Sequence, residues 1–340
     1  TKQRVTKDSI VFSIKSMGVV YRGKYNEKRD TIFGSFKQGV MLQSLAFAKT
    51  NKVYSLSRPQ EPKPPYPYIE KELGFKVEGV DYDFKGTLTL PSNEGVYPCV
   101  ILITGSGMEN RDEEVFAHKP FKVIADYLTR NGIAVYRYDD RGWGAKTLDP
   151  KIKDATTFDF ANDAQAAFEM LKKQPNIDPK NIGMLGHSEG GAIASICASR
   201  NKDLKYIILF AGPGMKGIDV LMQQNEEVFK QQNAPKYVID VQLASLKKIY
   251  ELIDRSLPNE EIKKLMNEWF DNESKKYSKE EWKNIQFSSE ASRIQFISML
   301  TSEWMKTFIK LDPADYLRTV KQPVFAINGT KDVQVLSKYN

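Results

Sequence analysis

Short, continuous apolar runs separated by amphipathic segments limit the fold of this chain more than any other feature. The runs are Cys99 to Ile103, Ile133 to Tyr138, Ile182 to Leu185, Tyr206 to Phe210 and Val324 to Ile327. Such runs are typical of parallel strands that are buried on both faces of a sheet. Between them, Phe121 to Asn131, which ends at Gly132, and residues 160–171 carry the apolar stripe of a helix. The alternation predicts an α/β fold with a doubly wound, mostly parallel sheet. Two further edge strands are expected at Phe75 to Val80 and Phe84 to Leu90.

The alternation is interrupted once, by a helical pattern that runs over residues 213–322. An insertion of this size between two sheet strands predicts a helical cap over their carboxyl ends, where the site of such a sheet lies. Its larger apolar side chains either line a substrate pocket or pack the core of the cap, and packing is the simpler interpretation. They are Met215, Met222, Met299, Trp304 and Met305.

The first part of the chain has a different pattern. From Ser9 to Lys49, apolar and polar residues alternate in short runs punctuated by glycines, which predicts a partial, antiparallel β-rich domain over residues 1–56. Five prolines between Arg58 and Pro67 predict an extended connector over residues 57–69. The α/β domain is then expected over residues 70–340, without its C-terminal end.

The strand predicted at Ile182 to Leu185 continues into Gly186-His187-Ser188-Glu189-Gly190 and then into a helix of small residues. A strand, Gly-x-Ser-x-Gly and a helix in this order form a nucleophile elbow, a sharp turn that exposes the serine hydroxyl. Gly186 and Gly190 let the strand and the helix approach each other closely. Ser188 is therefore the predicted catalytic nucleophile.

Acyl transfer through a serine also needs hydrogen-bond donors for the oxyanion that forms on the substrate. One donor is expected from the backbone N–H of Glu189, directly after the nucleophile. The second is expected from the loop Thr104-Gly105-Ser106-Gly107-Met108, which follows the Cys99 to Ile103 strand. The backbone N–H of Ser106 or Gly107 is the candidate.

Composition excludes some classes of protein. Although the formal net charge is +7, the basic residues lie in Lys-rich helices without Arg clusters, which favours a solvated surface over nucleic-acid binding. No apolar run is long enough to span a membrane. The two cysteines, Cys99 and Cys197, are too few for a disulfide framework and are expected to be buried thiols.

Several motifs occur in an order that resembles one family. They are Leu102 to Glu113, His118 to Phe121, Tyr138 to Gly142 and Gly186 to Gly191. Together they resemble bacterial carboxylesterases of the EstD type, which belong to the serine aminopeptidase-like (S33-like) group of α/β-hydrolases. The resemblance covers roughly Glu70 to Asn340 and implies an α/β-hydrolase fold after a small β-rich domain. It implies no metal or organic cofactor.

The resemblance also implies the acid of the catalytic triad. In this family the acid follows the next-to-last strand, which matches Asp332 in the turn after Val324 to Ile327. Asp139 and Asp140 are competing acids, but they lie beside Arg141, where a structural ion pair is the simpler interpretation. Arg111 and Asp112 are expected to brace the loop that carries the second oxyanion donor.

The catalytic base is not evident. Only His118 and His187 are present, and both precede Asp332, whereas the family's histidine follows the acid after one more helix and strand. His187 is the variable position of the elbow, and its side chain is expected to point away from the serine hydroxyl. His118 matches a loop position that does not act as the base. We therefore expect the base beyond Asn340 and little activity from the 340 residues alone.

These features predict a serine esterase that cleaves carboxylic esters of small acyl groups through an acyl-enzyme intermediate. A peptidase of the same fold is the first alternative, and a non-catalytic binding module that lacks the histidine is the second. The expected partner is a small-molecule ester, without nucleic acid or a membrane span. The sequence leaves homo-oligomerisation open, as well as a periplasmic, secreted or cytoplasmic location in a bacterium.

Overall fold

The computed structural model describes residues 2–14, 19–38, 41–51, 57–145, 149–231, 234–285 and 287–339. The chain divides into two compact units, each of which is described here by itself. One unit holds residues 57–224 and 301–340 and contains the mixed α/β sheet, and we call it the hydrolase unit after the family that its sequence resembles. The other holds residues 1–56 and 225–300.

The hydrolase unit is built on a seven-stranded sheet in the order β12-β11-β10-β8-β9-β7-β6. Its strands are β6 (Ile69–Glu72), β7 (Gly86–Leu90), β8 (Tyr97–Ile103), β9 (Ala134–Tyr138), β10 (Ile177–His187), β11 (Ile207–Phe210) and β12 (Val324–Ile327). The five strands from β12 to β9 are parallel, and β7 runs antiparallel to β9. The mostly parallel sheet predicted from the apolar runs is therefore confirmed.

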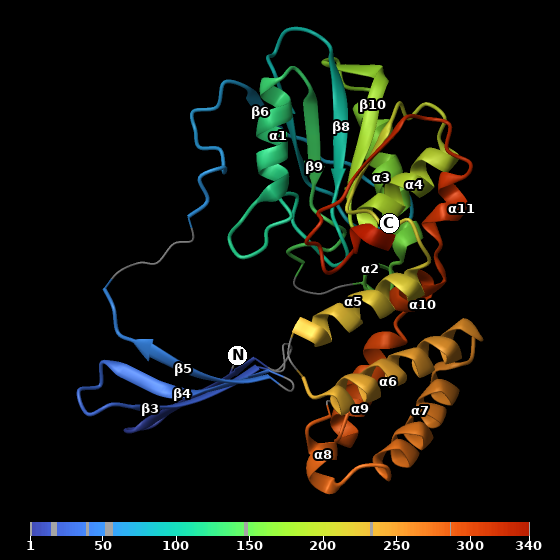
Figure 1. The fold of residues 1–340 in the computed structure, drawn as a ribbon. Helices are drawn as coiled ribbons and strands as arrows, with labels where there is room; N and C mark the ends of the chain where they lie inside the picture. Colours follow the sequence, from blue (N-terminus) through green and yellow to red (C-terminus); the bar gives the residue numbers. More distant parts are fainter. Residues whose placement is uncertain are drawn as a thin grey trace. The chain divides into compact units, whose positions relative to one another are not determined.

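Helices cover both faces of this sheet. The helices of the unit are α1 (Pro120–Arg130), α2 (Pro150–Lys153), α3 (Thr157–Leu171), α4 (Glu189–Arg200), the first half of α5 (Gly217–Gln231), α10 (Glu303–Lys310) and α11 (Pro313–Leu317). Figure 1 shows α1 on one face of the sheet and α3 and α4 on the other. Because side chains alternate along a strand, Val100 and Leu102 of β8 pack against α1, whereas Ile101 and Ile103 join the core formed with α3 and α4.

The first edge strand differs from the prediction. Phe75 to Val80 is not a strand, and Phe75 makes only an isolated bridge with Phe84, with their rings stacked 4.5 Å apart. The chain turns back between them, at Gly79, whose φ is +75°. Strand β6 lies earlier, at residues whose charged side chains hide the strand pattern.

The other unit contains a five-stranded antiparallel meander, as the alternating N-terminal pattern predicts. Its strands are β1 (Lys2–Val5), β2 (Ser9–Ile14), β3 (Val19–Tyr25), β4 (Thr31–Gln38) and β5 (Met41–Ala48). Tyr21 is fully buried at its centre, where its hydroxyl donates to the carbonyl oxygen of Leu45 over 3.0 Å. Gly23 and Gly34 are cross-strand partners, and a Cβ on either would come 2.7 Å from atoms of the Tyr21 ring.

This second unit also contains the helices α6 (Lys236–Asp254), α7 (Asn259–Ser274), α8 (Lys279–Lys283) and α9 (Glu290–Leu300). Helix α8 begins with a capping box, in which the Ser278 hydroxyl accepts from the Glu281 amide and the Glu281 carboxylate accepts from the Ser278 amide. The predicted cap at 213–322 spans the division of the chain, because its flanks belong to the hydrolase unit. Its role over the sheet stays a prediction.

Candidate active site

The topology of the sheet singles out the loops after β8 and β10. These two strands are neighbours, but β9 continues the sheet beyond β8 and β11 continues it beyond β10. In an open α/β sheet, a crevice forms at the carboxyl ends of the strands where the strand order reverses, and ligands bind there. The two loops at this point carry Ser106 and Ser188.

Ser188 lies on a strained turn between β10 and α4. Its φ is +51° and its ψ is −120°, a conformation that non-glycine residues rarely adopt. Close packing enforces the turn. A Cβ on Gly186 would lie 1.9 Å from the carbonyl oxygen of Gly190, and a Cβ on Gly190 would lie 2.4 Å from that of Ile103. Only glycine fits at either position, as the elbow motif predicts.

The turn opens into a cavity of about 500 Å³. Its walls include Ser188, His187, Ser106, Glu109, Glu113 and Trp304. Cavities of this size hold small-molecule ligands. The backbone N–H of Ser188 donates to the carbonyl oxygen of Phe210 on β11 over 3.0 Å. This hydrogen bond holds the turn against the neighbouring strand.

One of the two residues predicted to supply the second oxyanion donor lines the cavity. Ser106 lies on the cavity wall, whereas Gly107 is not among the lining residues. The preceding amide, that of Gly105, donates to the Glu113 carboxylate over 2.9 Å and is therefore occupied. The Glu189 amide begins helix α4, where a helix leaves its first N–H groups without helical partners.

The Glu189 side chain has a second function that the sequence did not reveal. It is 1% exposed, and its carboxylate accepts from the Thr157 hydroxyl over 2.6 Å and from the Trp304 indole over 2.9 and 3.1 Å. Burial raises the pKa of Glu189, and the hydrogen bonds from Thr157, Ser106 and Trp304 oppose that rise. The carboxylate thus joins the elbow, α3, α10 and the loop after β8.

His187 and Glu113 form an ion pair in the cavity wall. The imidazole Nδ1 lies 2.6 Å from the Glu113 carboxylate oxygen that also accepts the Gly105 amide. Burial by itself lowers the pKa of His187. The hydrogen bond with Glu113 and the charges of Glu113, Glu109 and Asp332 together raise the pKa by more, so its net shift is upward. The hydrogen bond between His187 and Glu113 ties the elbow to the loop after β8. His187 lines the same cavity as Ser188, and the expected direction of its side chain, away from the serine hydroxyl, stays a prediction.

Glu109 is the least compensated acid of the cavity. Its Oε2 atom is buried and has no hydrogen-bond partner among the described residues. Burial and the neighbouring charge of Glu113 raise its pKa, whereas His187 lowers it. Its backbone N–H is bound to Asp140, which also accepts from the Thr104 hydroxyl, both over 2.8 Å. Burial raises the pKa of Asp140 to about 8.

Asp332 lies in the turn after β12, as expected for the acid. Its carboxylate accepts from the backbone amides of Gln334 and Val335 over 2.8 and 3.0 Å, so the turn is held in one shape. Gln334 and Val335 line the Ser188 cavity, and the charge of Asp332 acts on His187. The structure therefore brings the predicted acid to the same end of the sheet as the predicted nucleophile.

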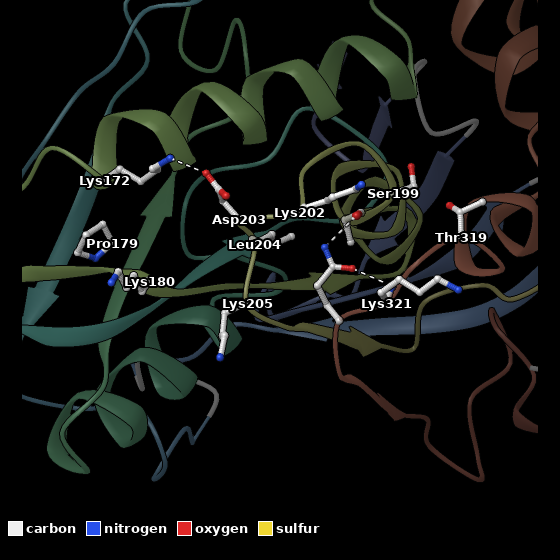
Figure 2. A pocket seen from close by; sticks show the side chains of 12 residues that line it. Lys172, Pro179, Lys180, Ser199, Lys202, Asp203, Leu204, Lys205, Thr319 and Lys321 are labelled. Carbon is white, nitrogen blue, oxygen red and sulfur yellow. Dashed lines mark hydrogen bonds and ion pairs between the residues drawn. The ribbon is translucent and has the colours of Figure 1, made fainter.

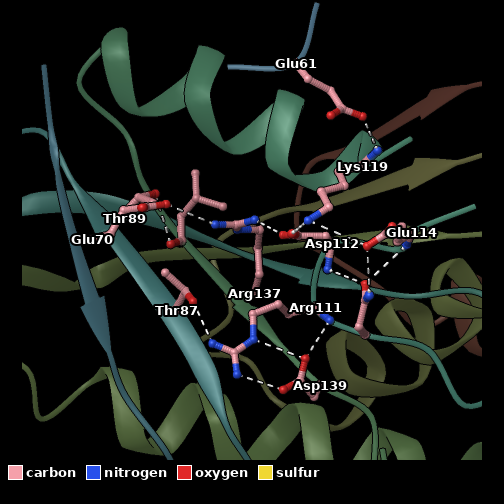
Figure 3. A network of polar contacts seen from close by, with 12 residues as sticks. Glu61, Glu70, Thr87, Thr89, Arg111, Asp112, Glu114, Lys119, Arg137 and Asp139 are labelled. Carbon is pink, nitrogen blue, oxygen red and sulfur yellow. Dashed lines mark hydrogen bonds and ion pairs between the residues drawn. The ribbon is translucent and has the colours of Figure 1, made fainter. Parts of the chain in front are cut away.

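Arg111 braces the loop after β8, as predicted. Its guanidinium binds Asp139 with two nitrogen atoms, at 2.7 and 3.1 Å, and contacts Thr87 over 2.7 Å (Figure 3). It also binds the Glu72 carboxylate over 2.7 Å. Asp139 thus forms a structural ion pair, as predicted, but its partner is Arg111 and not Arg141. Asp139 lies directly after β9 and binds the loop through Arg111, whereas the nearby Arg141 points towards α3.

Arg141 instead pairs with Asp163 of α3, over 2.6 and 2.7 Å, and both side chains are buried. On the other side of the loop, Asp112 pairs with the buried Arg137 of β9 (Figure 3). Lys119 lies 3.7 Å from Asp112. Two separate arginines therefore hold the loop against the sheet.

His118 anchors the proline-rich connector. Its Nδ1 atom lies 3.1 Å from the Glu61 carboxylate, which also accepts the Lys119 amide over 2.9 Å. A second contact joins the Arg58 guanidinium to the carbonyl oxygen of Phe116 over 3.2 Å. These contacts explain His118 without catalysis, in agreement with the sequence-based interpretation.

Cys99 and Cys197 are buried free thiols, as expected. In the part of the chain that the structure describes, no set of three or more His, Cys, Asp or Glu side chains is arranged to hold a metal ion. None of the described helices has the length and apolar character needed to cross a membrane.

A mostly parallel sheet with a strand, Gly-x-Ser-x-Gly and a helix at its switch point defines the α/β-hydrolases. The chain has this fold and this elbow, and it is therefore an α/β-hydrolase.

Comparisons with known proteins place it more closely. The family model described as serine aminopeptidase, S33, matches residues 118–263. The esterase EstD of Thermotoga maritima is 28% identical over 192 residues, which are 56% of this chain and 45% of that protein. The thiohydrolase aneE of Aspergillus aculeatus is 33% identical over 90 residues, which are 25% of this chain and 26% of that protein. The chain thus spans less than half the length of these curated relatives.

Among solved structures, the α/β-hydrolase GrgF from a Penicillium species is 14% identical, with a TM-score of 0.48 over 80% of this chain and 83% of that chain. A hypothetical protein from Pseudomonas aeruginosa is 14% identical, with a TM-score of 0.48 over 84% of this chain and 85% of that chain. These sequence relatives support the assignment to the α/β-hydrolases that the sheet and the elbow give.

Proposed function

We propose that the protein is a serine hydrolase that cleaves carboxylic esters of small acyl groups through an acyl-enzyme on Ser188. The observation that carries this proposal is the strained turn of Ser188, which opens into a cavity at the switch point of the sheet. Strain of this kind is retained only where the surrounding structure enforces it, and it is concentrated at functional sites. A cavity of about 500 Å³ supports a small substrate.

In this proposal, the backbone amides of Ser106 and Glu189 bind the oxyanion of the tetrahedral intermediate. Glu113 supports this assignment, because it occupies the Gly105 amide and leaves the next amide of the loop for the substrate. The Glu189 amide has the added field of the α4 N-terminus, which favours negative charge. Donors that are fixed before the reaction stabilise developing charge without reorganisation.

Asp332 is the proposed acid, and its role is to orient the histidine that takes the Ser188 proton. His187 is a poor candidate for that histidine because its Nδ1 is bound to Glu113 and the surrounding carboxylates raise its pKa. His118 is bound to Glu61. The proposed base is therefore a histidine that follows Asp332 in the sequence, as the family resemblance implies.

The test is covalent labelling of the full-length protein with a fluorophosphonate, together with turnover of p-nitrophenyl acetate. Ser188→Ala should abolish labelling and lower the turnover by several orders of magnitude. Ser199→Ala is the matched control, because Ser199 lies on α4 outside the cavity and its hydroxyl is bound to the Ile196 carbonyl. Labelling that survives Ser188→Ala would contradict the proposal.

A second candidate, supported by Glu109, is the hydrolysis of substrates that carry an amine near the scissile acyl group. The Oε2 atom of Glu109, which has no hydrogen-bond partner among the described residues, and the adjacent Glu113 give the cavity two carboxylates beside His187. An ammonium group would supply the missing donor. Aminoacyl and acyl p-nitrophenyl esters of matched size distinguish the two functions. Under this second function, Glu109→Gln should selectively raise the KM of the aminoacyl ester.

A further inference from the structure

The hydrolase unit has a second concave region, at the edge of the sheet opposite Ser188. It has a volume of about 800 Å³, and we call it the lysine groove. Its charged lining residues are Lys172, Lys180, Lys202, Lys205, Lys321 and Asp203. Lys180 lies in the amino-terminal part of β10, and Lys205 and Lys321 lie shortly before β11 and β12. Because parallel strands begin at the same edge, separate segments bring these lysines together.

Most of the positive charge of the groove is not neutralised. Lys172 is bound to Asp203, the one carboxylate in the lining, over 2.9 Å. The other four lysines form no salt bridge within the ranges that the structure describes. The charges of two of these lysines, Lys180 and Lys205, act on the nearby carboxylate of Asp178. Its pKa is lowered first by hydrogen bonds from Asn181 and the Lys180 amide, and then by the charges of Lys180 and Lys205.

The floor of the groove is fixed by the core of the unit. Leu204 is 1% exposed and packs into the main apolar cluster. The Gln322 side-chain amide donates to the carbonyl oxygens of Ala198 and Asn201, over 3.0 and 2.9 Å, at the end of α4. This contact pins the segment before β12 to the end of α4. The groove is therefore formed before any ligand binds, and little ordering is needed on binding.

Figure 2 shows the ammonium groups distributed around the groove rather than directed at one point. A single phosphate would reach few of them, whereas an extended anion with several charges would reach more. Lysine binds phosphate as a compact point charge with rotatable donors, and the flexible side chains suit such a ligand.

We propose that the lysine groove binds a small, extended anion with several negative charges, of the oligophosphate type. Its volume is within the range of small-molecule sites. None of its lining residues is aromatic, which disfavours single-stranded nucleic acid because that ligand is held by stacking. Its concavity disfavours a flat membrane surface. The site is separate from the Ser188 cavity and does not depend on the proposed hydrolase function.

The test is calorimetric titration of the protein with sodium tripolyphosphate at low and at physiological salt. We expect saturable binding that weakens with salt, because the contacts are between charges. The double variant Lys202→Gln/Lys205→Gln should bind about tenfold more weakly or worse, since a tenfold change needs only one strong contact. The control is Lys85→Gln/Lys153→Gln, which removes the same charge from exposed lysines outside the groove. Its affinity should stay within about twofold of that of the unmodified protein.

Unchanged thermal unfolding and circular dichroism would show that the variants are folded. The proposal is overturned if the unmodified protein shows no saturable binding, or if both double variants weaken it equally, since net charge would then explain it. It is also overturned if a single-stranded oligonucleotide or an anionic vesicle binds and tripolyphosphate does not displace it.

Discussion

Replacement of Glu189 by alanine should destabilise the hydrolase unit, because its buried carboxylate holds side chains from three other elements. The change removes the acceptor for the Thr157 hydroxyl at 2.6 Å, the Trp304 indole at 2.9 Å and the Ser106 hydroxyl. Each lost hydrogen bond to a charged group is worth about 1.5–3 kcal/mol, and a stranded donor adds to the loss. Part of this is recovered, because ionised Glu189 is itself unfavourable when buried, as its raised pKa shows. We expect a net loss of about 3 kcal/mol.

Glu189→Gln is the matched control. The amide keeps one carbonyl oxygen for Thr157 and Trp304, and its NH₂ group can donate to the Ser106 hydroxyl, which accepts as well as donates. It also removes the buried charge, so the free energy of unfolding should stay within about 1 kcal/mol of that of the original chain.

The assay is hydrogen exchange of peptides from β8 and β10 along a urea series, because these buried strands report the unfolding of this unit alone. A difference of about 3 kcal/mol corresponds to an increase of about two orders of magnitude in the exchange-competent population. If alanine costs less than about 1 kcal/mol, or if glutamine is as damaging as alanine, the carboxylate does not hold these elements together as we infer.

Three further changes test other parts of the site. Gly190→Ala would place a Cβ 2.4 Å from the Ile103 carbonyl oxygen and should prevent folding, whereas Gly329→Ala, whose Cβ would lie 3.9 Å from the Cβ of Asp332, should be tolerated. Circular dichroism and the yield of soluble protein compare the two variants. Because burial raises the pKa of Asp140 to about 8, the native state holds a proton that the unfolded chain releases, so stability should fall as the pH rises from about 4 to 8. Asp140→Asn should flatten this dependence in urea unfolding at several pH values, and an unchanged slope would contradict the assignment. Arg111→Lys should lower the free energy of unfolding by about 1–2 kcal/mol in the same assay, because an ammonium group cannot make both of the hydrogen bonds that the guanidinium donates to Asp139.

The elements that could be predicted from the sequence are those with an unbroken apolar run or a local motif. Strands β8 and β9 and the second half of β10 are buried on both faces, so their runs of apolar residues are unbroken, whereas β12 carries such a run although it is exposed. The elbow glycines belong to a local motif, although the contact that requires Gly190 comes from Ile103. Strand β6 was missed because its Glu and Lys residues lie at the edge of the sheet, where they are exposed to solvent. A local pattern carries no information about such a strand, since its pairing with β7 decides it.

The polar contacts of the site were the hardest to predict. Trp304 reaches Glu189 from a helix more than a hundred residues away in the sequence, and nothing near either residue signals the bond. The Asp139 pairing failed for a related reason. Arg141 is closer in sequence, but the chain turns after β9 and directs it towards α3, which leaves Arg111 to bind Asp139. Glu113 and His187 are likewise joined only by the adjacency of β8 and β10.

The pairing of β10 between β8 and β11 also bears on how the protein folds. Helix α1, strand β9 and helices α2 and α3 separate β8 from β10 in the sequence, so their contact closes a long loop. Contacts of this kind form slowly, because the entropy of loop closure is lost before the contact is gained. The Ser188 turn additionally needs the carbonyl oxygen of Phe210, which β11 supplies only after the chain has passed through α4. We therefore expect the nucleophile to acquire its reactive geometry late in folding. Compact intermediates in which β11 has not yet paired would then lack a reactive Ser188.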